Sequence, residues 1–418
     1  MRQAIELLRH EPRGRVFFIA MAQSSLGTGA ALVALTLLAY ARLESGWAIA
    51  LVLMADVLPA MIFGPVFGAA ADRWSRRACA VTADVLRAGA FLGIALVDSF
   101  TATVVLALVA GIGTGLFTPA ALASLPSLVE ESRLPAATAL YGAVTDVGFT
   151  VGPAIAAGLL ILGGAETLMG VNSATFALSA LLLARLRFGQ APEGEPDRPR
   201  ASLLRDAREG IAATARIEGL PTVLLASAAA LFLGAVFNVA ELPFVTSELG
   251  SGSSGYALLV SFHGVGFIAG SLSGSKGGDL EALRRRFLYG LLLVGAALAA
   301  TGAAPTYAVA IAAITFGGFA NGVLLIHERL IIQATVADRL SARAYGARDA
   351  LTAWAFALAF LSAGGLISVL DLRVLIVGAG AVGLGVWLAA VAALRRPRIS
   401  DGDAPESPSV RRNIAIRS

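Results

Sequence analysis

The sequence predicts an all-α integral membrane protein with about twelve transmembrane helices in two pseudo-symmetric halves of six. Three observations predict this class. Hydrophobic residues make up 57% of the 418 residues and charged residues only 14%, whereas a soluble domain carries roughly a quarter charged residues. Apolar runs of about 20 residues, the length that crosses a bilayer, recur along the whole chain. Basic residues concentrate in alternate connections between these runs, as the positive-inside rule requires.

Twelve apolar runs are long enough to span a membrane. The first follows a basic N-terminal segment and continues from Val16 to Tyr40, which is too long for a cleavable signal and indicates a retained span. The ninth and tenth runs nearly touch, with Pro305 as the clear break between them. The predicted spans are 16–40, 47–69, 78–97, 101–125, 140–163, 166–187, 220–245, 255–275, 287–304, 307–331, 345–369 and 372–394.

The connections between spans set the predicted orientation. Arginines cluster after the even-numbered spans, within 73–77, 133, 198–216, 284–286 and 339–343. The opposite connections hold little beyond Arg42 and Arg373. The positive-inside rule places the arginine-rich connections in the cytoplasm. We therefore expect a multi-pass protein of the inner or plasma membrane with cytoplasmic N- and C-termini.

The longest connection divides the chain into two halves, 1–188 and 220–394. The connecting segment 189–219 opens with the proline-rich sequence APEGEPDRPR and continues as an amphipathic pattern, which predicts a cytoplasmic linker with a helix along the membrane surface. RLPAATALYG after span four and RLSARAYG after span ten occupy equivalent places, which indicates an internal duplication. The polar tail 395–418 is expected to be disordered.

Several classes of function are disfavoured. The net charge of +4 comes from arginines spread between spans, a pattern unlike a nucleic-acid footprint. Cys79 is the single cysteine, so an intrachain disulfide is excluded. His327 lacks a second histidine four residues later, because position 331 is Ile331, and no P-loop occurs. We expect no enzyme activity, no metal, no cofactor and no nucleic-acid partner, and a monomer in the lipid bilayer.

The connection after span two carries the most specific motif, GAAADRWSRR. It combines a glycine for close helix packing, an acid that can accept from a helix N-terminus, and three arginines that anchor the loop on the cytoplasmic side. These residues are Gly68, Asp72, Arg73, Arg76 and Arg77. An ordinary positive-inside loop is the alternative interpretation. The motif resembles the loop signature of the major facilitator superfamily, a family of transporters built from repeated halves.

Span five carries a second motif, GFTVGPAIAAG. It resembles the glycine-proline motif of antiporters in that superfamily, and generic small-residue packing is the alternative. Its matching residues are Gly148, Gly152, Pro153 and Gly158. The stretches 127–140, 202–221 and 336–351 are similar to the branch with macrolide-efflux and enterobactin-exporter proteins.

That resemblance implies a secondary active transporter that works by alternating access. It implies efflux of a small amphipathic compound, such as a drug, a macrolide or a siderophore-like molecule, in exchange for protons. Span four lacks the arginine found in many proton-coupled relatives, so proton coupling rests on the resemblance alone. The alternatives are a nutrient importer with the same fold and, further away, a membrane-embedded enzyme or a sensor that transports nothing.

Ionisable groups inside a bilayer are costly, so each one in a span is a candidate functional residue. Asp56 in span two is the candidate proton carrier, because burial of a carboxylate favours its neutral form and permits reversible protonation. A hydrogen bond to a neighbouring helix is the alternative role. Asn238, Glu241 and His263 are further candidate proton or substrate sites, although Glu241 can lie at the outer interface and His263 can be an interhelical packing residue.

Three more charged residues lie in spans three and five. Asp84 and Arg87 are three residues apart near the cytoplasmic end of span three, and Asp146 lies one to two turns into span five. We expect these residues to form a charge network at an inner gate, with Asp146 as a further candidate proton or substrate site.

Overall fold

The computed structural model describes residues 2–186, 215, 217–336 and 338–395, and this part of the chain is helical without strands. A short helix, α1 (Arg2–His10), precedes the spans. The first bundle contains α2 (Pro12–Leu43), α3 (Gly46–Arg73), α4 (Arg76–Leu96), α5 (Phe100–Leu128) and α6 (Leu134–Arg185). The second contains α8 (Leu220–Pro243), α9 (Ser253–Ser271), α10 (Leu280–Gly302), α11 (Tyr307–Thr335), α12 (Asp338–Val369) and α13 (Leu372–Arg395).

The helices agree with the predicted spans. Ten helices in the described part are long and apolar enough to cross a membrane. One of them, α6, contains both span five and span six. The two spans are separated by a break in the helix at Gly164, whose φ of 74° favours glycine. The predicted ninth span corresponds to α10. This helix is not one of the ten, because the arginines in its first turns make it less apolar than the others. It starts at Leu280 because the Asp279 carboxylate caps it, accepting from the amide of Ala282 at 2.8 Å.

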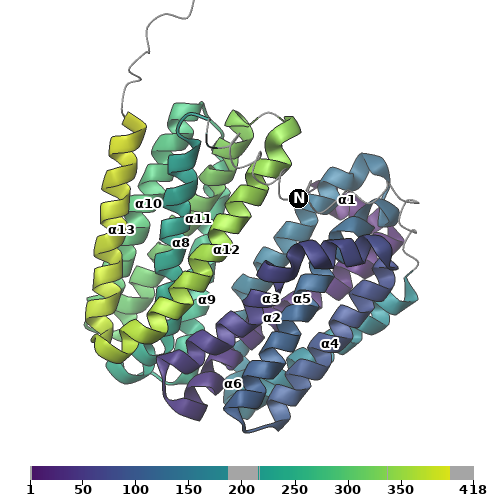
Figure 1. The fold of residues 1–418 in the computed structure, drawn as a ribbon, viewed down its shortest axis with the longest axis horizontal. Coiled ribbons are helices and arrows are strands. Elements are labelled where there is room, and N and C mark those ends of the chain that lie inside the picture. Colours follow the sequence, from purple (N-terminus) through teal and green to yellow (C-terminus); the bar gives the residue numbers. More distant parts are fainter. Residues whose placement is uncertain (1, 187–214, 216, 337, 396–418) are drawn as a thin grey trace, which may run out of the picture.

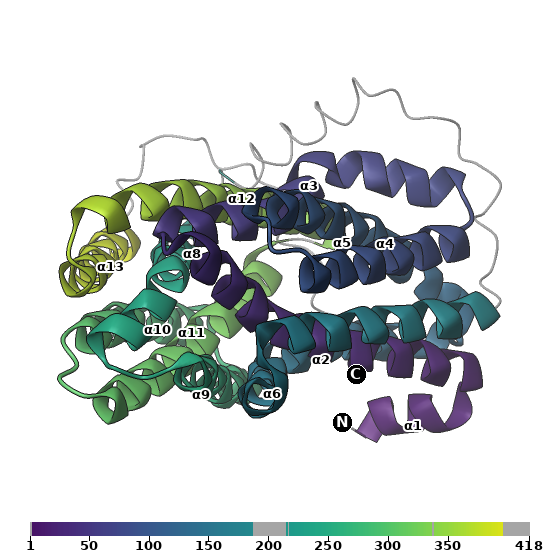
Figure 2. The same ribbon diagram turned by 90° about the horizontal axis from the view of Figure 1, so that it is seen from below.

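The two bundles are arranged as a V. Figure 1 shows them separated at the end that carries the N-terminus and together at the opposite end. The most extensive contacts between the bundles are those of α6 with α9 and of α3 with α12, and Figure 2 shows both pairs side by side. The chain is therefore an all-α multi-pass membrane fold of two bundles, and residues of both line a central space between them.

Glycines of the span-five motif bring α6 onto α2. A Cβ atom on Gly152 would lie 2.6 Å from the Cα atom of Gly29, and one on Gly148 would lie 2.5 Å from the Cβ atom of Ser25. Close approach of two backbones is the usual role of small residues between membrane helices. Gly158, by contrast, is exposed, and a Cβ atom there would meet nothing within 4 Å.

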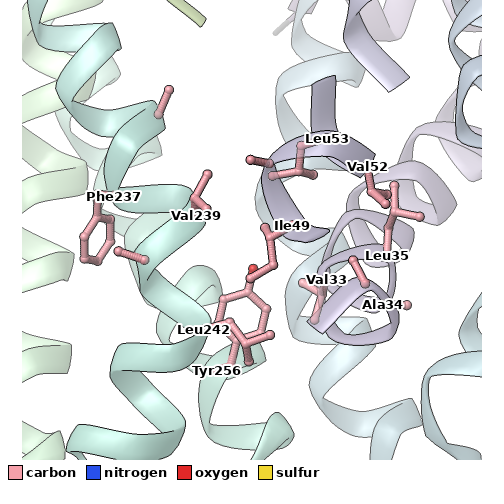
Figure 3. Packing of buried hydrophobic residues seen from close by; sticks show 14 of the residues in the cluster. Val33, Ala34, Leu35, Ile49, Val52, Leu53, Phe237, Val239, Leu242 and Tyr256 are labelled. Atoms are coloured by element: carbon pink, nitrogen blue, oxygen red, sulfur yellow. The ribbon is translucent and has the colours of Figure 1, made fainter. Parts of the chain in front are cut away.

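Apolar side chains close the end at which the bundles meet. A Cβ atom on Gly364 of α12 would lie 2.6 Å from the ring of Trp47 on α3. Next to this contact, Ile49, Leu242 and Tyr256 are buried in one hydrophobic cluster, and Figure 3 shows them gathered between α3 and α8. This packing seals one end of the central space with side chains from both bundles.

The N-terminal segment contains a helix that the span pattern does not predict. Leu7 of α1 is fully buried and belongs to the same cluster as Phe17 and Leu128. Just beyond α1, the Glu11 carboxylate pairs with the Arg133 guanidinium at 3.1 Å. Helix α1 is thus packed against the first bundle and continues almost directly into α2.

Three predictions lie wholly or mainly outside the described residues. Nearly all of the linker 189–219 and nearly all of the tail 395–418 are outside them. The helix α3 reaches Arg73, but the side chains of Gly68, Asp72 and Arg73 are also outside the described part. Of the loop motif, Arg76 donates to the carbonyl of Ala123 at 2.7 Å, and Arg77 donates to the carbonyl of Ala184.

Candidate functional site

A central cavity of about 770 Å³ lies between the two bundles. It is lined by α2 to α6 on one side and by α8, α9 and α12 on the other. Its volume falls within the roughly 300–1,000 Å³ of pockets that hold drug-sized ligands. Tyr256 of α9, which belongs to the cluster at the sealed end, lines this cavity together with Met61 of α3 and Asp349 of α12.

The lining combines aromatic rings with acidic side chains. The aromatic residues are Phe91, Phe149, Phe176, Tyr256, Phe356 and Phe360. The acidic residues are Asp56, Glu241 and Asp349, and no lysine, arginine or histidine occurs among the described residues that line this cavity. Aromatic faces and carboxylates both attract cations, so the lining favours an amphipathic ligand with positive charge.

Asp56 is partly buried on α3 and faces the central cavity. Its helix is held close to α5, because Gly111 contacts the backbone carbonyl of Asp56 and leaves no room for a Cβ atom. No ion pair forms at Asp56 within the described residues.

Glu241 and Asn238 lie one helical turn apart on α8, and both line the central cavity. Glu241 is only 5% exposed. Within the described part of the chain, its carboxylate has neither an ion pair nor a hydrogen bond. Glu241 is therefore enclosed within the protein, and it lines the cavity close to the end of α8.

A smaller side pocket of about 160 Å³ opens behind these two residues, inside the second bundle. It adds His263 of α9 and Asn321 of α11 to the lining. The side pocket and the central cavity share Asn238, Glu241, Val260 and Phe356, so the two spaces are adjacent. Three of the predicted site residues, Asn238, Glu241 and His263, thus meet at one place.

Asp84 and Arg87 form a buried ion pair inside the first bundle. The Arg87 guanidinium lies 4.4 Å from the ring centroid of Phe117 and 4.2 Å from that of Phe176. Phe176 in turn stacks on Phe91 with 5.7 Å between centroids, and both rings line the central cavity. The pair therefore supports the aromatic wall of the cavity.

Asp146 is not part of that network. It is exposed on α6, lines neither cavity, and forms no ion pair with Arg87 among the described residues. The two parts of the predicted gate network are thus separate in the structure.

Replacing Asp84 with asparagine is expected to destabilise the protein by about 3–5 kcal/mol, because it leaves the buried Arg87 charge without its counter-ion. The measurement is thermal unfolding of purified protein in detergent, with Asp146→Asn as the control, since Asp146 is exposed. Equal melting temperatures for Asp84→Asn and wild type would show that the pair does not stabilise this bundle.

Sequence reasoning missed two residues that line the cavities, Tyr256 and Asn321. It also missed an ion pair outside their linings, in which Glu328 of α11 contacts Arg348 of α12 at 3.3 Å. A polar residue within an apolar run was the available signal for Asn321 and Glu328. No such signal marks Tyr256, because a tyrosine near a span end is common at membrane interfaces. In the described residues, no group of three His, Cys, Asp or Glu side chains is placed to hold a metal ion.

Comparisons with known proteins agree with this architecture. The chain is 26% identical over 421 residues to "Multidrug efflux pump Tap" of Mycobacterium tuberculosis (strain ATCC 25618 / H37Rv), covering 96% of this chain and 98% of Tap. It is 25% identical over 370 residues to "Putative bacilysin exporter BacE" of Bacillus amyloliquefaciens, covering 87% of this chain and 90% of BacE. The crystal structure of nucleoside transporter NupG has the same fold, with a TM-score of 0.71, 13% identity, and coverage of 92% of this chain and 100% of NupG.

The family assignment follows from a match over most of the chain. The family model described as Major Facilitator Superfamily matches residues 16–280, from the first span through the start of α10. The two-bundle fold and the cavity between the bundles are those expected of this family. The chain belongs to the major facilitator superfamily.

Proposed function

We propose that this protein is a secondary active transporter that exports small amphipathic compounds from the cytoplasm by alternating access, in exchange for protons. The observation that carries the proposal is the central cavity of about 770 Å³, which is sealed at one end and lined by aromatic and acidic side chains. A transporter needs a site of this kind between two bundles that can rock against each other.

The relatives support export rather than import. Tap is named a multidrug efflux pump and BacE a putative bacilysin exporter, and the alignments cover most of each chain. A broad, mostly apolar cavity with few polar groups suits compounds that partition into membranes, whereas a nutrient importer needs several placed polar contacts for specificity.

The conformation supports alternating access. If the termini are cytoplasmic, as the arginine distribution predicts, the end at which the bundles separate faces the cytoplasm and the end sealed by Trp47, Ile49, Leu242 and Tyr256 faces outward. We propose that the halves 1–188 and 220–394 rock about the α3–α12 and α6–α9 contacts, opening the sealed end while closing the other.

Asp56 is the proposed proton site. It faces the cavity without an ion-pair partner in the described residues, so it can be reached by protons from the open end. A carboxylate in an apolar lining can bind a proton from one side of the membrane and release it to the other when the cavity changes sides. Coupling of substrate export to proton movement requires such a group.

The test uses purified protein in proteoliposomes with an imposed pH gradient. We expect uptake of labelled amphipathic compounds from a broad panel into vesicles with an acidic interior, and collapse of that uptake when the gradient is dissipated. In intact cells, a strain lacking the protein should retain more of the same compounds than the wild type. Gradient-independent fluxes together with unchanged efflux by the deletion strain would overturn the proposal. Accumulation that requires the protein would indicate import.

A further inference from the structure

The side pocket inside the second bundle is lined by several polar side chains, and two of these do not line the central cavity. Its polar side chains converge from three helices: Asn238 and Glu241 from α8, His263 from α9 and Asn321 from α11. Phe237 and Phe356 also line it, and Figure 3 shows Phe237 pointing away from α3. Carboxylate and amide oxygens beside aromatic faces are the groups that bind an alkylammonium ion.

Glu241 is the critical member of this set. It is about 95% buried, and it lacks an ion pair and a hydrogen bond within the described residues. An ionised carboxylate is strongly destabilised in an apolar interior unless a cation accompanies it. Because His263 is the one basic side chain among the described residues of this lining and forms no ion pair with Glu241, a cationic ligand can supply the missing charge.

The volumes of the two spaces indicate how a ligand divides between them. A cavity of about 150 Å³ holds a molecule the size of benzene, so the side pocket, at about 160 Å³, accepts a compact group and excludes a drug-sized molecule. The central cavity is large enough for the rest of such a molecule. The two spaces are adjacent, because they share the lining residues Asn238, Glu241, Val260 and Phe356.

We propose that the side pocket is a head-group subsite, in which Glu241 binds the ammonium group of a cationic amphiphile while the apolar body of that molecule occupies the central cavity. The inference rests on the proposed transport function and names the class of substrate. It assigns Glu241 to substrate and leaves the proton to Asp56, because of these two carboxylates Glu241 lines both spaces and Asp56 lines the central cavity alone.

The test is ligand binding by the full-length protein in detergent, measured as stabilisation against heat, which grows with the ratio of ligand concentration to Kd. The matched probes are 4-phenylbutylammonium and 4-phenyl-1-butanol, which have the same body and differ in the charge of the head. We expect the wild type to bind the cation at least about tenfold more tightly than the alcohol, as a charge-assisted contact in a buried site provides. Glu241→Gln should remove this preference, and Glu241→Asp should retain part of it.

A second variant tests the pocket without touching the charge. A Cβ atom on Gly234 would meet nothing within 4 Å, and Gly234 lines only the side pocket, so Gly234→Leu should fill the pocket without a backbone clash. We expect it to weaken binding of the cation by about tenfold or more while leaving the alcohol almost unaffected. Gly378→Leu is the matched control, since Gly378 is an exposed glycine of α13 with equally open surroundings.

Three outcomes would overturn the inference: equal wild-type affinity for both probes, an unchanged preference in Glu241→Gln and Gly234→Leu, or stabilisation by Na⁺ alone that depends on Glu241. The assay requires no gradient and no transport. A protein that binds the cation as expected but moves nothing in proteoliposomes would therefore refute the proposed function and leave the subsite in place.

Discussion

Replacing Asp56 with asparagine is expected to abolish transport driven by a pH gradient, reducing it to the background of protein-free liposomes. Asparagine conserves the shape of the side chain but cannot exchange a proton. Because Asp56 lines the cavity and is not one of the described ion pairs, the substitution removes a titrating group without leaving a partner charge unpaired. The measurement is initial uptake of a labelled substrate into proteoliposomes with an acidic interior.

A second readout separates loss of coupling from loss of folding. The Asp56→Asn protein should still exchange labelled for unlabelled substrate across the membrane without any gradient, since the cavity and its seal remain. Asp98→Asn is the control, because Asp98 is exposed in the connection between α4 and α5. If the Asp56→Asn protein took up substrate under a pH gradient at the rate of the wild type, Asp56 would be eliminated as the proton site.

Replacing Gly152 with leucine is expected to prevent stable packing of α6 on α2. A Cβ atom at this position would lie 2.6 Å from the backbone of Gly29 and Ala30, so the two helices would have to separate. Overpacking a core by a few methylene groups costs about 1–3 kcal/mol even when side chains can adjust, and here a backbone is in the way. We expect a large loss of monodisperse protein in size-exclusion chromatography and a lower melting temperature.

The same motif supplies its own control. Gly158→Leu makes the identical chemical change at an exposed position on α6 where a Cβ atom meets nothing within 4 Å. Its yield and melting temperature should remain close to those of the wild type. If Gly152→Leu behaved like Gly158→Leu, close contact of α2 and α6 would not be a requirement of this fold.

These two predictions concern different parts of one mechanism. The α2–α6 contact is within the first bundle, whereas Asp56 lines the cavity that this bundle shares with the other. Rocking of rigid bundles can expose the cavity to alternate sides only if each bundle moves as a unit. Gly152→Leu should therefore lower the stability of the protein, whereas Asp56→Asn should leave the protein folded and abolish only the transport driven by a pH gradient.

The membrane class, the approximate positions of the spans and the family follow from the amino-acid sequence alone. These properties depend on local quantities: about 20 apolar residues cross a bilayer wherever they occur, and a motif such as GAAADRWSRR is contiguous in the chain. The ends of the helices are harder to predict from hydropathy, because capping residues such as Asp279 let α10 begin before its apolar run.

Which polar residues lie together, by contrast, depends on how the helices pack. Asp56 and Glu241 are 185 positions apart, as their numbers show, yet they line one cavity. Asp146 does not line this cavity, although its helix, α6, contributes other residues to the lining. Inside a membrane, lipid-facing and cavity-facing side chains are both apolar, so hydropathy cannot assign a helix face. The side pocket at Glu241, His263 and Asn321 exists only because α8, α9 and α11 pack with those faces together.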